Sequence, residues 1–136
     1  MDIERLAQGI CDKVGCEKEF TGDEENPEYK LVFDVDENRK QEVFVYPFEE
    51  DNKGFLRIFT YIGKKSDFTP NKLISLLDLN MSLRFGAFAV FQGQVVLQAS
   101  AMYDSVVDED KVVHKIKYIM KMADSLERSL FGLDRK

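Results

Sequence analysis

Apolar residues recur along this chain with two different periods, and the changes of period predict its elements. Over about residues 2–14 the apolar positions lie three or four residues apart, which is the spacing of one face of a helix. Gly15 follows and suits a left-handed C-terminal cap. The predicted stripe consists of Ile3, Leu6, Ala7, Ile10, Cys11 and Val14.

Three segments with a period of two follow, at residues 29–35, 41–48 and 54–63, and they predict strands. In the second segment two valines alternate with aromatic residues, and in the third Leu and Ile alternate with aromatic residues. Pro47 places its end of the second strand at an edge or outside the sheet. The connections are short and polar, so the strands are expected to pair antiparallel.

A second helix is predicted from residue 70 to about residue 79. Thr69 suits its N-cap and Pro70 its first position, and Asn80 is a plausible stop. A hairpin follows over Leu79 to Asp104, with its turn at Gln92-Gly93, where Gly supplies the positive φ that a tight hairpin needs. A last amphipathic helix is predicted over about Asp108–Leu130.

The element order is therefore α-β-β-β-α-β-β-α. It predicts one α+β domain over residues 1–136, with a single five-stranded antiparallel sheet and three helices. Apolar residues of the last hairpin fall on both faces of its strands, so the second face of the sheet needs a cover. The helices could divide between the two faces, the sheet could fold over its own edge, or a second copy or a bound client could cover the face.

The charge of the chain argues against nucleic acid as a partner. The net charge is −6, and residues 1–70 carry 10 basic and 17 acidic groups, a net of −7. Nucleic-acid binders usually carry a basic excess. The one basic cluster is predicted to be a solvated flank of the last helix; it consists of Lys111, Lys115, Lys117 and Lys121.

No apolar run is long enough for a membrane span, so no membrane partner is expected. Residues 1–13 are amphipathic and acidic, which is typical of neither a signal peptide nor a transit peptide. Cys11 and Cys16 have no metal-ligand spacing and are predicted to be two free thiols, as in a reducing compartment. We therefore expect a cytoplasmic protein, and a bacterial one.

No motif predicts a catalytic, metal or cofactor site. Asp34, Asp36 and Asn38 begin like a calcium loop, but Arg39 and Val45 stand where that loop needs Gly and Glu, so a charged hairpin loop is expected. His114 is predicted to point to solvent from the last helix, with no nucleophile paired to it. Phosphate-binding glycine loops are absent from the sequence. The chain is expected to be no enzyme and to need no cofactor.

Residues 76–127 resemble the YbjN family and its structural relatives, the class I type III secretion chaperones. The resemblance rests on a short helix ending in L-x-x-N at Leu77-Asn80, an "FGAF" segment at Phe85–Phe88, a "VxLxA" strand at Val95–Ala99 and the long last helix. It implies a homodimer that binds other polypeptides without ATP, as an extended client segment that adds strands and fills apolar pockets.

The resemblance also implies two sets of site residues. The dimer surface would involve Leu73, Leu76, Leu77, Phe85 and Phe88. The client pockets would lie around Leu6, Phe33, Phe44, Tyr46 and Phe59. Two alternatives stay open: a YbjN-type regulatory or stress-linked protein without a dedicated client, and a small-ligand binder or enzyme that uses a pocket between helix and sheet.

Overall fold

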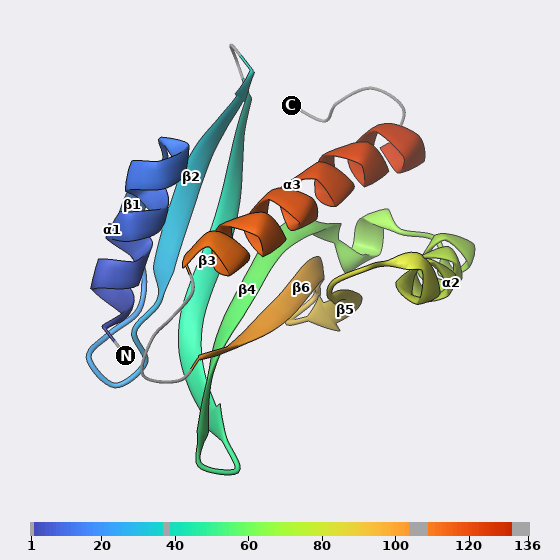
Figure 1. Ribbon diagram of the computed structural model, residues 1–136. Coiled ribbons are helices and arrows are strands. Elements are labelled where there is room, and N and C mark those ends of the chain that lie inside the picture. Colours follow the sequence, from blue (N-terminus) through green and yellow to red (C-terminus); the bar gives the residue numbers. More distant parts are fainter. Residues whose placement is uncertain (1, 37–38, 104–108, 132–136) are drawn as a thin grey trace.

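A computed structural model describes residues 2–36, 39–103 and 109–131 of the chain. It confirms an α+β fold with three α-helices and an antiparallel sheet (Figure 1). The elements are α1 (Ile3–Val14), β1 (Glu17–Phe20), β2 (Tyr29–Asp36), β3 (Arg39–Glu50), β4 (Lys53–Lys64), η1 (Lys65–Asp67), α2 (Pro70–Leu79), η2 (Asn80–Ser82), β5 (Ala87–Phe91), β6 (Gln94–Tyr103) and α3 (Glu109–Phe131).

The sheet has six strands, so the prediction of five is wrong. Its order is β1-β2-β3-β4-β6-β5, with all neighbours antiparallel. The additional strand is β1, which pairs with β2 from Glu17 opposite Val32 to Phe20 opposite Tyr29. Three charged residues in a row hide this strand from a search for alternation, and it forms because its backbone completes one edge of β2.

The strand before the last turn is shorter than predicted. The sequence alternates from Leu83 onward, but β5 begins only at Ala87. Gly86 has φ 79°, a left-handed backbone that cannot continue a ladder, and η2 precedes it. The turn itself is as predicted, because Gln92 and Gly93 have φ 51° and 76°, the pair of positive values of a type I′ hairpin.

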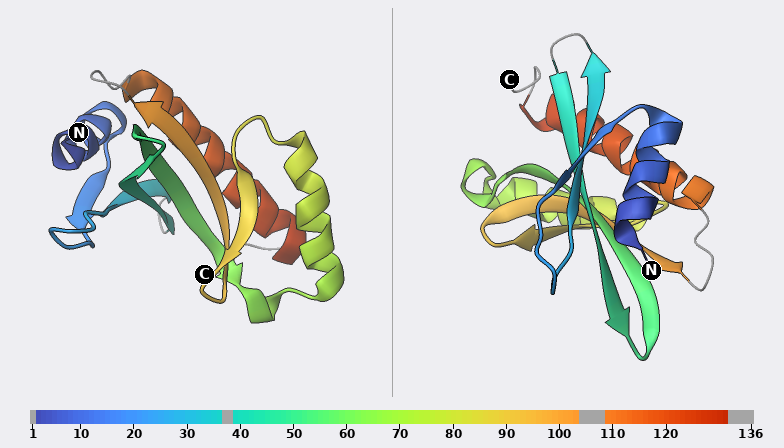
Figure 2. Two further views of the ribbon diagram at one scale, coloured as in Figure 1. Left: turned by 90° about the horizontal axis from the view of Figure 1, so that it is seen from below. Right: turned by 90° about the vertical axis from the view of Figure 1, so that its left-hand side faces the viewer.

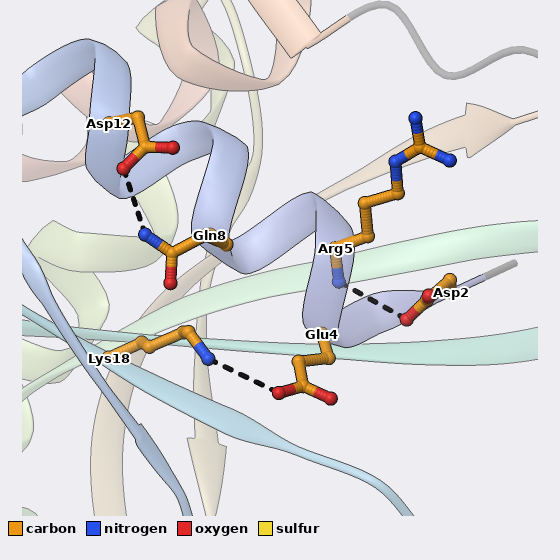
Figure 3. A network of polar contacts seen from close by, with 6 residues as sticks. All are labelled: Asp2, Glu4, Arg5, Gln8, Asp12 and Lys18. Atoms are coloured by element: carbon orange, nitrogen blue, oxygen red, sulfur yellow. Dashed lines mark hydrogen bonds and ion pairs between the residues drawn. The ribbon is translucent and has the colours of Figure 1, made fainter.

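The helix-end signals predicted at Gly15, Thr69 and Pro70 are confirmed, and Asp2 provides an N-cap that was not predicted. Asp2 caps α1 by accepting a hydrogen bond from Arg5 N at 3.1 Å, and Gly15 ends α1 with φ 71°. Thr69 caps α2 by accepting from Lys72 N at 3.2 Å, and Pro70 is its first residue. On the exposed side of α1, Gln8 binds Asp12 and Glu4 reaches Lys18 of β1 (Figure 3).

Cys11 and Cys16 form a disulfide, so the prediction of two free thiols is wrong. The left-handed turn at Gly15 folds the chain back on the end of α1, where Gly15 N and Cys16 N both donate to the carbonyl of Cys11, at 2.7 and 3.3 Å. The same turn brings the two Cα atoms to 4.5 Å. The argument for a reducing compartment from free thiols therefore loses its basis.

The two long helices pack on the same face of the sheet. α1 contacts β1, β2 and β3, α3 contacts β3, β4 and β6, and the two helices contact each other. Figure 2 shows both helices on one side, while α2 lies beyond β5 at the end of the sheet. The core therefore lies between this face and the two helices. Its fully buried strand residues include Leu31, Val43, Val45, Leu56, Ile58 and Leu97.

Two predicted absences concern the described residues only. None of their helices is long and apolar enough to cross a membrane. Within residues 2–36, 39–103 and 109–131, no three His, Cys, Asp or Glu side chains gather as metal ligands.

Of the calcium-like pattern, Asn38 lies outside the described residues, and Asp34 Oδ1 lies 3.9 Å from Lys40 Nζ across the hairpin. His114 is exposed, as predicted.

Candidate binding groove

The face of the sheet opposite α1 and α3 carries a row of aromatic side chains on its two longest strands. Because side chains alternate along a strand, the valines and leucines that enter the core leave the residues between them on the other face. We call these six residues the aromatic face. They are Phe44, Tyr46 and Phe48 on β3 and Phe55, Phe59 and Tyr61 on β4.

The six rings form one connected set. Phe44 stacks on Phe59 with centroids 5.1 Å apart, and Phe48 stacks on Phe55 at 5.2 Å. The rings of Tyr46 and Tyr61 join these pairs at centroid distances of 5.3–6.3 Å. Each such pair contributes about 0.5–1.5 kcal/mol beyond burial. Because each ring contacts its neighbours, the rings also shield one another from water. Phe59 contacts three other rings and is only 7% exposed, although no helix of the described chain covers it.

A groove of about 900 Å³ lies over one part of this face. Its floor contains Tyr46, Phe48, Arg57 and Phe59, together with Val96 and Gln98 of β6. One wall is β5, through Ala89, Val90 and Phe91, and the other is the loop between β1 and β2, through residues 25–28. Phe91 is about half exposed and lies on the same face of the sheet as Val96, so the wall of β5 presents apolar surface to the groove.

The loop wall is held by its own hydrogen bonds. Asp23 Oδ1 accepts from Glu25 N at 3.0 Å and from Asn26 N at 2.7 Å, which is an Asx turn. Thr21 N donates to the carbonyl of Glu28 at 2.9 Å and so closes the loop at its base. The groove thus has one wall made by a strand and one made by an internally hydrogen-bonded loop.

The rim of the groove is acidic and its floor holds one cation. Glu25, Glu28 and Glu49 line the groove, and Arg57 is the only basic residue among its lining residues. The charge of Glu28 also acts on the aromatic face. Burial raises the pKa of the Tyr61 phenol above its ordinary value, and the negative charge of Glu28 raises that pKa further. An occupant is therefore favoured if it carries positive charge toward the rim.

The structure brings three of the five predicted client residues together. Phe44, Tyr46 and Phe59 are neighbours on the aromatic face. Leu6 and Phe33 are buried in the core between the sheet and the helices, on the opposite side.

The five predicted dimer residues are divided between core and surface. Leu76 and Phe88 are buried in the core, and Leu73 packs against it. Phe85 is half-buried, edge-on to the rings of His114 and Tyr118 on α3. Leu77 is 64% exposed and is the one member of the set that faces solvent. A substitution such as Phe88→Asp would therefore test folding, and not assembly.

Several residues of the aromatic face and of the groove were not assigned a role from the sequence. Alternation already places Phe48, Phe55 and Tyr61 on the face of Phe44 and Phe59, and it places Arg57 there too, so this signal could have found them. The loop of residues 25–28 carries no such signal, because its place beside the groove comes from the pairing of β1 with β2.

A second, smaller cavity of about 300 Å³ lies where β3 and β4 diverge beyond Phe44 and Phe59. Gln41 Nε2 donates to Thr60 Oγ1 at 3.0 Å, and Thr60 Oγ1 donates to the carbonyl of Glu42 at 2.7 Å. Arg39 pairs with Asp124 of α3 at 2.6 Å. These hydrogen bonds and this ion pair link β3 to β4 and to α3 at the point where the two strands diverge.

Comparison with known proteins leaves the geometry as the basis for function. No protein-family model matches the chain, and no curated protein matches it. The resemblance to YbjN proteins and secretion chaperones therefore stays a prediction.

Proposed function

We propose that this chain is a non-enzymatic polypeptide-binding module that holds an extended segment of another protein in the groove over the aromatic face. The observation that carries the proposal is the groove itself, a formed hollow with an aromatic floor on the sheet face that α1 and α3 leave uncovered. Concave surfaces of this size that are lined mainly by apolar side chains and a few polar groups are typical of binding sites.

The shape of the groove favours an extended segment. Its floor follows β3, β4 and β6, and its walls are β5 on one side and residues 25–28 on the other. In an extended segment every second side chain points to the same side, so alternate apolar residues could contact the rings. Tyr and Phe offer large, rigid contact area with few side-chain torsions to fix, which suits such recognition.

Charge complementarity defines the chemistry of this partner. The rim carboxylates Glu25, Glu28 and Glu49 favour Lys or Arg in the residues that flank the apolar anchors. The same carboxylates disfavour single-stranded nucleic acid, which also stacks on aromatic sheet faces but brings a phosphate for every base. A polypeptide with apolar anchors and basic flanks fits both features.

We further propose that the module is a homodimer joined through the outer side of α2. Ile74, Leu77 and Met81 follow one another at helical spacing over α2 and η2, and they are 57%, 64% and 91% exposed. This α2 stripe replaces Leu73, Leu76 and Phe88 as the proposed contact, because those three residues pack within the chain. A second copy would cover the stripe with an identical surface.

A cytoplasmic location is part of the proposal and has its own test. Disulfides are rare in reducing compartments. In the cytoplasm we therefore expect Cys11 and Cys16 to react as two thiols when cells are lysed in a thiol-alkylating reagent. If both cysteines resist alkylation until a reductant is added, the location is an oxidising compartment.

A matched pair of variants tests the groove. Phe91 on β5 lines it, while Phe20 on β1 lies outside it, and both side chains are 50% exposed on edge strands. The probe is a set of short, fluorescently labelled peptides selected from a random library on the unmodified protein. We expect Phe91→Ser to weaken their binding, measured by fluorescence anisotropy, by about tenfold, and Phe20→Ser to leave it within about twofold.

Two results would overturn the proposal. One is a selection that yields no peptide binding to the unmodified protein, which would favour the alternative of a regulator without a dedicated client. The other is an equal effect of the two variants, which would place the binding surface away from the groove.

A further inference from the structure

Arg57 is a half-buried cation in the middle of the aromatic face, and no carboxylate in the described part of the chain forms an ion pair with it. It lies on β4 between Phe55 and Phe59, opposite Tyr46 of β3. Its guanidinium carbon stands 4.6 Å from the centroid of the Phe48 ring, and its Nη1 donates to Gln98 Oε1 at 2.7 Å. Its Nε is buried without a hydrogen-bond partner among the described residues.

Lys30, a second cation on this face of the sheet, is paired with two carboxylates. Lys30 of β2 lies opposite Phe44, so it is on the same face as Arg57, and its side chain is 22% exposed. Glu19 and Glu42 hold its Nζ at 3.3 and 3.1 Å. Within residues 2–36, 39–103 and 109–131, no carboxylate forms an ion pair with Arg57.

The guanidinium of Arg57 has N–H donors that Gln98 does not use. It has five N–H groups in a planar fork, and Gln98 uses one of them. The guanidinium lies over the ring of Phe48 and donates to Gln98, so two contacts within the chain hold it in place. A carboxylate matches such a fork with two parallel hydrogen bonds, which is the strong form of this contact.

We infer that the polypeptide bound in the groove places a carboxylate on Arg57, and this inference rests on the proposed function. The bound segment then has three parts: apolar side chains on the rings, one carboxylate at the floor, and basic side chains toward Glu25, Glu28 and Glu49. The carboxylate comes from an Asp or Glu side chain or from the C-terminus of the segment. A phosphate is disfavoured, because its second negative charge would face the three rim carboxylates.

The first arm of the test uses the unmodified protein and the peptides selected on it. Each peptide is made in three forms: with every Asp and Glu replaced by Asn and Gln, with its C-terminus amidated, and with both changes. We expect one single change to weaken binding, measured by fluorescence anisotropy, by about tenfold or more, as for other close ion pairs. Which change does so identifies the source of the carboxylate.

The second arm uses variants of the protein. Arg57→Met removes the charge and keeps an apolar stem on Phe48, while Arg57→Lys keeps the charge without the fork. Arg5→Met is the matched control, because Arg5 is exposed on α1 on the other side of the sheet. Against Arg57→Met we expect the neutral and charged forms of each peptide to bind equally. Against Arg57→Lys we expect part of the difference, and against Arg5→Met all of it.

The outcomes separate this inference from the proposed function. Peptides that bind the groove equally well in charged and neutral form overturn the carboxylate contact and leave the peptide-binding function standing. A preference for a phosphorylated form of the same peptides over the carboxylate forms also overturns it. If no peptide binds, both fail. The binding data for Arg57→Met are interpreted only if the circular dichroism spectrum and thermal midpoint of the variant match those of the unmodified protein. If they do not match, the first arm alone tests the carboxylate contact, because it uses the unmodified protein.

Discussion

The side-chain amide of Asn80 binds both backbone polar groups of Phe88. Its Oδ1 accepts a hydrogen bond from Phe88 N at 2.7 Å, and its Nδ2 donates to the carbonyl of Phe88 at 3.5 Å. Phe88 belongs to β5, an edge strand, and the outer backbone groups of an edge strand are open to pairing with other chains. Asn80 thus covers the edge of β5 in the way that a neighbouring strand would.

Asn80→Ala should destabilise the fold by about 1–2 kcal/mol, because it leaves the N–H of Phe88 without its partner. The measurement is the free energy of unfolding in urea. Asn71→Ala is the control, since Asn71 is exposed in the first turn of α2. Equal effects of the two substitutions would show that the contact between Asn80 and Phe88 contributes nothing to stability.

Gly86→Ala should be more destabilising than Gly93→Ala. Both glycines have a left-handed backbone, with φ 79° and 76°, so each substitution costs about 1–2 kcal/mol for the backbone alone. A Cβ at Gly86 would in addition collide with the carbonyl oxygen of Gln98 on β6, whereas a Cβ at Gly93 would meet open space. Chemical denaturation of both variants checks this, and a loss at Gly93 as large as at Gly86 would contradict it.

Leu77→Asp should convert a dimer into a folded monomer, because Leu77 is 64% exposed in the middle of the α2 stripe. Leu76→Asp should instead unfold the chain, since Leu76 is 3% exposed and a buried unpaired charge costs several kcal/mol. Light scattering after size exclusion gives the mass, and circular dichroism gives the fold. A mass near 15.7 kDa for the unmodified protein at micromolar concentration would refute the homodimer.

Tyr61 should ionise at a higher pH than an ordinary phenol in the folded protein. Burial raises its pKa, and the charge of Glu28 raises it further. Because the folded state holds this proton more tightly, the associated stability is fully present below the unfolded pKa of about 10 and is lost as the pH rises through the higher folded pKa. Tyr61→Phe should remove this alkaline loss of stability.

The ultraviolet absorbance of phenolate during an alkaline titration measures this effect. Glu28→Gln should lower the pKa of Tyr61 without returning it to the ordinary value, because burial is the larger cause of the raised pKa. If Tyr61→Phe leaves the alkaline titration curve unchanged, Tyr61 does not have a raised pKa.

The sequence predicted the elements that carry local signals, such as capping residues, an apolar helix stripe or alternating strand residues. α1 and α2 have capping residues, α1 and α3 have apolar stripes, and the strands β2, β3 and β4 alternate over seven residues or more. β1 could not be predicted, because Glu17, Lys18 and Glu19 show no alternation and its pairing with β2 depends on the fold. The start of β5 was placed too early, since alternation does not reveal the left-handed backbone of Gly86.

The groove was predictable in part. Alternation separates Val43 and Val45 from Phe44 and Tyr46 but does not say which set meets the helices. That choice depends on the packing of α1 and α3, which buries the valines. The disulfide also escaped prediction, because a five-residue spacing is no motif and only the turn at Gly15 brings the sulfur atoms together.

One-sided helix cover divides β3 and β4 into two interleaved sets of positions. Val43, Val45, Leu56 and Ile58 are constrained by the packing of α1 and α3, while the residues between them face away from these helices, and those that line the groove would be constrained by its proposed ligand. The second set can therefore diverge without compensating changes in the first. A scaffold of this kind can acquire a new ligand preference by substitution at every second residue, and among diverging copies the variable positions would fall on alternate residues of the same strands.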